Sequence, residues 1–133
     1  MTVVTDHVAL VERFFEQLRA GNLDGCLQCL HPDSEIYEPD GIPYGGRYRG
    51  PEGFGQLVAA VSELFEFEIN SVDAHAIGDR AMSILDATFV SRTTGKRLDT
   101  TVVEIYQFTD GLISFADIFP KDTRAIYGLT VDA

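Results

Sequence analysis

The sequence has no tryptophan, only two cysteines and no long run of uncharged apolar residues. A helix that crosses a membrane needs about 18 or more apolar residues in succession, so we expect no membrane partner. Cys26 and Cys29 have neither a second cysteine pair nor the pair of histidines that would complete a zinc site. The glycine-rich stretch also lacks the Lys-Ser/Thr pair of a phosphate-binding loop. The sequence therefore predicts no metal and no cofactor.

Basic residues are also scarce. Ten lysines and arginines stand against 21 acidic residues, which gives a net charge of −11. A charge of this sign repels phosphate backbones, so we expect no nucleic-acid partner. Residues 1–7 include Thr5, Asp6 and His7 where a signal peptide would have a basic start and an apolar run, which favours a cytoplasmic location.

The length of 133 residues predicts a single domain over residues 1–133. Apolar residues recur at helical spacing in segments 8–18, 23–30 and 51–65. Thr5 or Asp6 is placed to cap the first helix, and Asn22 to cap the second, which we expect to end at His31 and Pro32. A loop rich in glycine and proline follows over residues 39–50, and a short helix is predicted over residues 122–128.

Strand-like alternation begins at Phe65 and continues to about residue 119. Turn signals at residues 78–79, 94–95 and 110–111 divide this region into four strands. The apolar phase slips near Asn70 and Ser71, which predicts a bulge there. We therefore expect an α+β fold in which three N-terminal helices pack on a curved antiparallel sheet and enclose a pocket.

Two carboxylic acids fall on otherwise apolar strand faces. Glu104 is the acid of the face that includes Val102 and Tyr106, and Asp117 lies between Phe115 and Phe119. If residues 110–111 form a two-residue turn, Glu104 lies directly opposite Asp117. Two acids in one apolar space tend to share a single proton near neutral pH. The alternative is that these acids only form hydrogen bonds with each other or with Tyr106.

Other side chains are candidates for the pocket or its mouth. Glu38 precedes Pro39 at the entrance to the glycine-rich loop, and Asp86 lies on a neighbouring strand. The alternative interpretation for each of these acids is a side chain that faces solvent. The candidate substrate contacts are Phe14, Tyr37, Tyr44, Phe54, Asp86, Val102, Tyr106, Phe115 and Phe119.

Three stretches of the sequence resemble a known superfamily. RFFEQLRAGNLDG, EPDGIPYGGRYRGPEGF and FTDGLISFADIF are similar to the nuclear transport factor 2-like superfamily, and most closely to its SnoaL-like polyketide cyclases and ketosteroid isomerases. The resemblance covers nearly the whole chain. It implies a cone-shaped, cystatin-like fold, a homodimer, and cofactor-free acid/base catalysis on apolar ring compounds.

The resemblance also implies roles for particular residues. The catalytic base of the isomerases corresponds to Glu38, and the acid that helps to hold their oxyanion corresponds to Glu104. The acid/base aspartate of the cyclases corresponds to Asp117. The oxyanion tyrosine of the isomerases falls at Phe14, which has no hydroxyl group, and loss of such a donor typically slows catalysis by about 10²–10³-fold.

The leading hypothesis is an enzyme that moves a proton on a small apolar carbonyl compound, by isomerisation or aldol-type cyclisation. Asp117 is the predicted general acid or base, Glu104 its coupled partner and Glu38 a second base, while Tyr37 or Tyr44 supplies a hydrogen bond. One alternative is a pocket that binds or senses an apolar metabolite without turnover. Another is an interaction module that forms a homodimer through its sheet.

Overall fold

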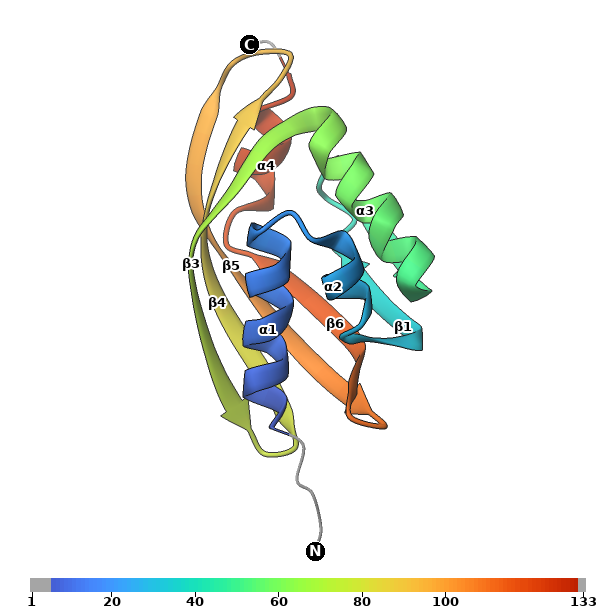
Figure 1. Cartoon of the computed structure of the whole chain (residues 1–133). Helices are drawn as coiled ribbons and strands as arrows, with labels where there is room; N and C mark the ends of the chain where they lie inside the picture. Colours follow the sequence, from blue (N-terminus) through green and yellow to red (C-terminus); the bar gives the residue numbers. More distant parts are fainter. Residues whose placement is uncertain (1–5, 132–133) are drawn as a thin grey trace, which may run out of the picture.

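A computed structural model describes residues 6–131 of the chain. Helices form one layer and a six-stranded curved sheet forms the other, which confirms the predicted α+β class (Figure 1). In chain order the elements are α1 (His7–Arg19), α2 (Leu23–Leu27), β1 (Leu30–Glu38), β2 (Gly46–Arg49), α3 (Gly50–Leu64), β3 (Phe65–Ile77), β4 (Arg80–Ser91), β5 (Arg97–Thr109), β6 (Leu112–Pro120) and α4 (Thr123–Gly128).

The first two helices begin at polar caps. The Asp6 carboxylate accepts a hydrogen bond from the Ala9 N–H at 3.0 Å, and the Asn22 side chain accepts one from the Gly25 N–H at 3.1 Å. Such caps satisfy backbone donors that a helix leaves free in its first turn. Thr5, the alternative cap, lies outside the described residues. The helix α2 is shorter than predicted, because strand β1 already begins at Leu30.

The strand order in the sheet is β2-β1-β6-β5-β4-β3. Neighbouring strands are antiparallel except β1 and β6, which run parallel, a pair that the sequence prediction did not contain. Part of the loop predicted over residues 39–50 forms the edge strand β2. The parallel pair brings the end of β1 beside the end of β6, although the two strands are far apart in the sequence (Figure 1).

Two irregularities set the register of the long strands. The ladder between β3 and β4 shifts between Ile69 and Ser71, which confirms the predicted bulge. A second shift separates Ile113 from Phe115 in β6, so that Ser114 is an extra residue opposite β5. The sequence pattern did not predict this second bulge, and side chains after it point to the opposite face from the one predicted.

The turn between β5 and β6 forms as predicted, but the pairing beyond it does not. Thr109 pairs with Leu112, and Asp110 and Gly111 have φ angles of 54° and 75°, as in a type I′ hairpin turn. Because of the bulge, Glu104 pairs with Ile118 and not with Asp117. The prediction that Glu104 and Asp117 share a face is therefore wrong.

The helices α1, α2 and α3 cover one face of the sheet, here called the inner face (Figure 1). Cys26 and Cys29 are buried beneath them as free thiols, and the Cys26 Sγ lies 3.6 Å from the Phe14 carbonyl oxygen. Burial, followed by the nearby Cys29 thiol, raises the pKa of Cys26 to about 11. None of the helices within residues 6–131 has the length and apolar character needed to cross a membrane.

Candidate active site

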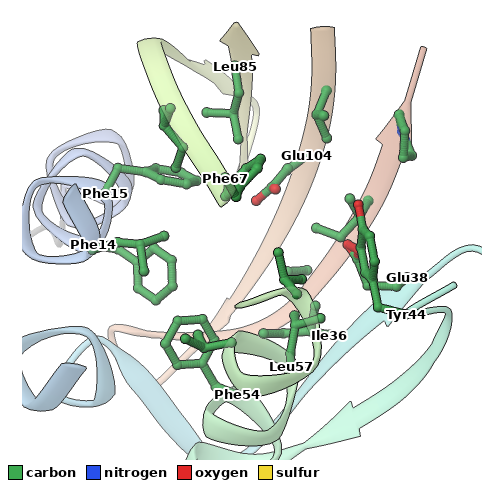
Figure 2. Close-up of a pocket in the computed structure, with 18 of the residues that line it drawn as sticks. Phe14, Phe15, Ile36, Glu38, Tyr44, Phe54, Leu57, Phe67, Leu85 and Glu104 are labelled. Carbon is green, nitrogen blue, oxygen red and sulfur yellow. The ribbon is translucent and has the colours of Figure 1, made fainter. Parts of the chain in front are cut away.

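A cavity of about 610 Å³ lies between the helices and the inner face of the sheet. This volume is within the usual range for small-molecule pockets. Figure 2 shows Phe14 and Phe15 of α1, and Phe54 and Leu57 of α3, directed toward the sheet. The aromatic lining consists of Phe14, Phe15, Tyr44, Phe54, Phe65, Phe67, Phe89 and Tyr106.

The structure divides the predicted site residues into two groups. Those that line the cavity are Glu38, Glu104, Phe14, Tyr44, Phe54, Val102 and Tyr106. The residues that do not line it are Asp117, Tyr37, Asp86, Phe115 and Phe119. All five members of the second group lie on the outer face of the sheet, and the bulge at Ser114 accounts for the three in β6.

Glu38 and Glu104 lie level with each other on the inner face, in a line that crosses the strands β1, β6 and β5. Ile118 of β6 pairs with Glu104 of β5, and Tyr37 of β1 pairs with Asp117 of β6, so Glu38 comes level with Ile118. Strands in a sheet are about 4.8 Å apart, so the two Cα atoms are separated by roughly 10 Å. Both side chains project into the same cavity (Figure 2).

Glu104 is held by a chain of hydrogen bonds. The Tyr106 hydroxyl donates to Glu104 Oε1 at 2.6 Å, and Ser83 Oγ lies 2.7 Å from the Tyr106 hydroxyl. Desolvation raises the pKa of Glu104 to about 7, and the Tyr106 hydrogen bond opposes this rise because it stabilises the carboxylate. Glu104 keeps part of its surface accessible and lines the cavity, so it remains within reach of a ligand.

Glu38 is buried at the end of β1, with only 5% of its surface exposed. Burial, and secondly the charge of Glu104, raise the pKa of Glu38 to about 8. Within residues 6–131 no side chain donates a hydrogen bond to its carboxyl group. Glu38 therefore differs from Glu104, which accepts a hydrogen bond from a hydroxyl group that favours its ionised form.

Tyr44 reaches the cavity from the loop between β1 and β2. Its ring packs against Phe65 and Phe89, with centroid distances of 6.2 and 6.5 Å. Figure 2 shows Tyr44 beside Glu38. Burial, followed by the charges of Glu38 and Glu104, raises the pKa of Tyr44, so this hydroxyl stays a hydrogen-bond donor near neutral pH.

Asp117 lies in a different environment on the outer face. It pairs with Tyr37 of β1. The Arg47 guanidinium lies over the Tyr37 ring, 4.3 Å from the ring centroid. Arg47 in turn forms an ion pair with Glu35, with 2.6 Å between Nη1 and Oε1. Asp117 has no contact with the Glu104 carboxyl group, so the catalytic role predicted for it loses its geometric basis.

Asp86 also lies on the outer face, where it is exposed. Its carboxylate accepts hydrogen bonds from the Ser71 hydroxyl at 2.9 Å and the Thr101 hydroxyl at 3.3 Å. These contacts fix Asp86 between β3 and β5 and leave it outside the cavity. The solvent-facing alternative for this residue is the one that the structure supports.

Several lining residues were not named by the sequence analysis. Phe65, Phe67 and Ile69 were visible as an alternating apolar face, which signalled a buried surface but not a cavity. Arg19 and Arg92 gave no signal, because isolated arginines at the ends of elements are common on any surface. No group of three or more His, Cys, Asp or Glu residues within residues 6–131 is arranged to hold a metal ion.

Comparison with known proteins identifies the family but not a substrate. The SnoaL-like domain family matches residues 11–116. A search of curated proteins found no significant match. Among solved structures, an NTF2-like protein of unknown function from Burkholderia pseudomallei K96243 is similar, with 21% identity, a TM-score of 0.86, and coverage of 97% of this chain and 100% of the other.

Two further neighbours have more informative names. A protein from Xanthomonas campestris pv. campestris, provisionally named a polyketide cyclase, has 16% identity, a TM-score of 0.79, and coverage of 92% of this chain and 95% of its own. TerC, co-crystallised with polyporic acid, has 20% identity, a TM-score of 0.83, and coverage of 93% and 97%. At these identities the neighbours establish the fold alone. With its matched region spanning most of its length, the chain belongs to the SnoaL-like domain family.

Proposed function

We propose that this protein is a cofactor-free enzyme that transfers protons on an apolar carbonyl compound, with Glu38 and Glu104 as the acid/base pair. One observation carries the proposal: two carboxyl groups share an apolar cavity of about 610 Å³, where burial raises the pKa of Glu38 to about 8 and that of Glu104 to about 7. Groups with pKa values close to the working pH are the most effective proton donors and acceptors. Asp117, the residue first predicted for this role, is replaced by Glu38.

The hydrogen bonds favour a particular division of labour. Tyr106 stabilises ionised Glu104, so between pH 7 and 8 the proton of the pair resides mainly on Glu38. Glu104 then removes a proton from the carbon next to the substrate carbonyl, while Glu38 donates its proton to the carbonyl oxygen. In an isomerisation, Glu104 returns its proton to a different carbon of the enol while Glu38 takes back the hydroxyl proton. In a cyclisation, the enol carbon attacks a second carbonyl of the same molecule, Glu104 protonates the new alkoxide, and Glu38 takes back the enol hydroxyl proton. This assignment exchanges the two roles that the resemblance implied.

Tyr44 supplies a second hydrogen bond to the developing oxyanion in this proposal. Phe14 stands at the position that the resemblance gives to the oxyanion tyrosine, and it lines the cavity without a hydroxyl group. Tyr44 enters the same cavity from the opposite wall, beside Glu38 (Figure 2). A donor in a water-poor site stabilises an oxyanion more than the same donor does in water.

The test does not require the natural substrate. Cyclic apolar ketones such as 1-tetralone are incubated with the protein in D₂O, and loss of the α-proton signal is followed by NMR. We expect the wild type to accelerate exchange, and Glu38→Gln and Glu104→Gln each to reduce the acceleration by about 100-fold or more. Asp117→Asn is the matched control and is expected to stay within about twofold of the wild type.

Two results would contradict the assignment. Exchange that survives both glutamine substitutions would remove the pair from the mechanism, and exchange that fails only in Asp117→Asn would restore the original prediction. Ketone binding to the wild type without any exchange would instead favour a non-catalytic pocket. The absence of a hydroxyl at Phe14 is the observation that supports this second candidate function.

A further inference from the structure

The mouth of the cavity is identified by the exposure of its lining residues. Of the residues that line the cavity, only five are exposed, and the rest are buried or half-buried. The five lie at the end of α1, at the end of α3, at the start of β3 and just after β4. They are Arg19, Ser62, Phe67, Glu68 and Arg92.

Phe67 confirms the position of this opening. Its side chain belongs to the inner face of the sheet, opposite Phe89, with ring centroids 4.8 Å apart. It is nevertheless 39% exposed, and Arg19 at the end of α1 and Ser62 near the end of α3 are exposed lining residues as well. The gap between the C-terminal ends of these two helices is therefore where the cavity meets solvent.

The charges of the lining are segregated along the cavity. Glu38 and Glu104 lie in its interior, whereas both cationic side chains of the lining, Arg19 and Arg92, lie at the mouth together with one acid, Glu68. The Arg92 Nε donates to the Ser62 carbonyl oxygen at 2.6 Å, which holds the guanidinium over the end of α3. Its Nη1 is 3.7 Å from Glu66, so this charge is partly balanced.

Arg19 is different, because no carboxylate within the described residues 6–131 approaches its guanidinium to 4 Å. Arg19 and Arg92 outnumber the single acid Glu68 among the exposed lining residues, in a chain whose net charge is −11. Arginine pairs readily with carboxylate, sulfonate and phosphate oxygens.

We infer that the ligand of this cavity is amphipathic, with an apolar body and carbonyl inside and an anionic group held at the mouth by Arg19 and Arg92. This inference rests on the proposed function for the carbonyl end and adds the chemistry of the other end. The arginines are specificity residues that do not touch the reacting atoms.

The experiment compares two dyes that share one ring system. 8-Anilinonaphthalene-1-sulfonate carries a sulfonate, and N-phenyl-1-naphthylamine is the same skeleton without it. Affinities are measured by fluorescence titration for the wild type and for Arg19→Gln/Arg92→Gln, and competition between the dyes establishes that both occupy one site. Arg80→Gln/Arg124→Gln removes the same charge at positions that do not line the cavity.

We expect the substitutions at the mouth to weaken binding of the sulfonate about three- to tenfold and to leave the neutral dye within about twofold. Raising the salt concentration weakens sulfonate binding to the wild type and has little effect on the mouth variant. The inference is overturned if both dyes lose affinity equally, if neither changes, if the distant control has the same effect, or if the dyes bind the wild type at separate sites or not at all.

The outcome is separable from that of the proposed function. Glu38→Gln leaves both guanidinium groups in place, so it is expected to retain the preference for the sulfonate while it loses proton exchange. If Glu38→Gln abolishes exchange and the mouth variant leaves the dye preference unchanged, the proposed function stands and this inference fails.

Discussion

At the scale of single residues, burial turns two ordinary glutamates into groups that titrate near neutral pH. Each has an ordinary pKa of 4.5, which rises to about 8 for Glu38 and about 7 for Glu104, with desolvation as the largest cause in both cases. Only Glu104 accepts a hydrogen bond from a tyrosine. The difference between the two pKa values therefore depends on the Tyr106 hydroxyl, which favours ionised Glu104, and on the Glu104 charge, which disfavours ionised Glu38.

Tyr106→Phe tests this dependence. The substitution removes the donor that stabilises ionised Glu104, so we expect the pKa of Glu104 to rise above about 7 and the acidic limb of the pH–rate profile to move to higher pH. Carboxyl ¹³C shifts followed through a pH titration give the direct measurement. Tyr127→Phe, at an exposed position on α4, is the control. An unchanged titration of Glu104 would contradict this account.

Glu38 should make folding stability depend on pH. Its carboxyl group is neutral in both states below pH 4.5, but between pH 4.5 and 8 the unfolded chain ionises while the folded protein resists ionisation. The contribution of neutral Glu38 to the free energy of unfolding is therefore complete below pH 4.5. It decreases as the pH rises to about 8 and does not change further above that pH. The loss is on the order of a few kcal/mol, since one pKa unit corresponds to about 1.4 kcal/mol.

Urea unfolding at pH 5 and pH 9 checks this prediction. Glu38→Gln cannot ionise, so we expect its free energy of unfolding to fall less than that of the wild type between the two pH values. Glu12→Gln changes an exposed residue of α1 and should retain the wild-type dependence. Parallel curves for the wild type and Glu38→Gln would show that Glu38 ionises freely in the folded state.

At the scale of the elements, a single residue in β6 decides which side chains face the cavity. The Ser114 bulge turns Ala116 and Ile118 inward and sends Phe115, Asp117 and Phe119 outward. Deletion of Ser114 should force β6 into a continuous ladder or break its pairing. A continuous ladder exchanges the two faces after the bulge and places the Asp117 carboxylate in the core, whereas broken pairing leaves the backbone groups of β5 and β6 without their partners.

We therefore expect deletion of Ser114 to destabilise the protein by more than about 3 kcal/mol, or to prevent folding, as measured by urea unfolding. Ser114→Ala keeps the extra residue and should cost less than about 1 kcal/mol. If the deletion variant were as stable as Ser114→Ala, the bulge would not be what sets the register.

The same bulge explains how far the sequence could predict the site. The bulge in β3 was predictable, because the apolar phase of the sequence changes between Ile69 and Val72. The bulge in β6 was not, since Ile113, Phe115 and Phe119 keep the same alternating spacing through it, and only Asp117 interrupts the apolar series. Exposed aromatic residues on the outer face therefore look the same in the sequence as core residues.

The helices, the hairpin turn and the pocket were predictable from periodicity and turn residues, and Glu104 was recognised as an acid on an apolar face. The partner of Glu104 was not predicted from pattern. Glu38 and Glu104 are 66 positions apart in the sequence. Their side chains enter one cavity only because β1 joins the sheet beside β6 and parallel to it. No local spacing in the sequence specifies that pairing.

At the scale of the whole molecule, no helix of residues 6–131 lies on the outer face of the sheet (Figure 1). Phe119 is 48% exposed there, and Val103, Ile105 and Phe115 are only half-buried. We propose that this face forms the homodimer implied by the family resemblance, since contiguous exposed apolar surface often marks an interface.

Phe119→Lys combined with Ile105→Lys should convert a dimer into a monomer, because it would bury two charges in the proposed interface. Light scattering during size-exclusion chromatography measures the mass. Leu23→Lys changes an exposed apolar residue of α2, on the other side of the molecule, and should leave the mass unchanged. A wild type that is monomeric at micromolar concentration would contradict the proposal.

The reactivity of the two buried thiols, Cys26 of α2 and Cys29 just after it, should report how often the helical layer separates from the sheet. Cys26 and Cys29 are at most 1% exposed, and a pKa of about 11 for Cys26 leaves very little reactive thiolate at pH 8. Alkylation can therefore proceed only from states in which the helical layer has separated from the sheet. Because the Cys26 thiol contacts the backbone of Phe14, which lines the cavity, any compound that binds inside should slow the labelling. Labelling rates would then allow compounds to be screened for binding before any reaction is known.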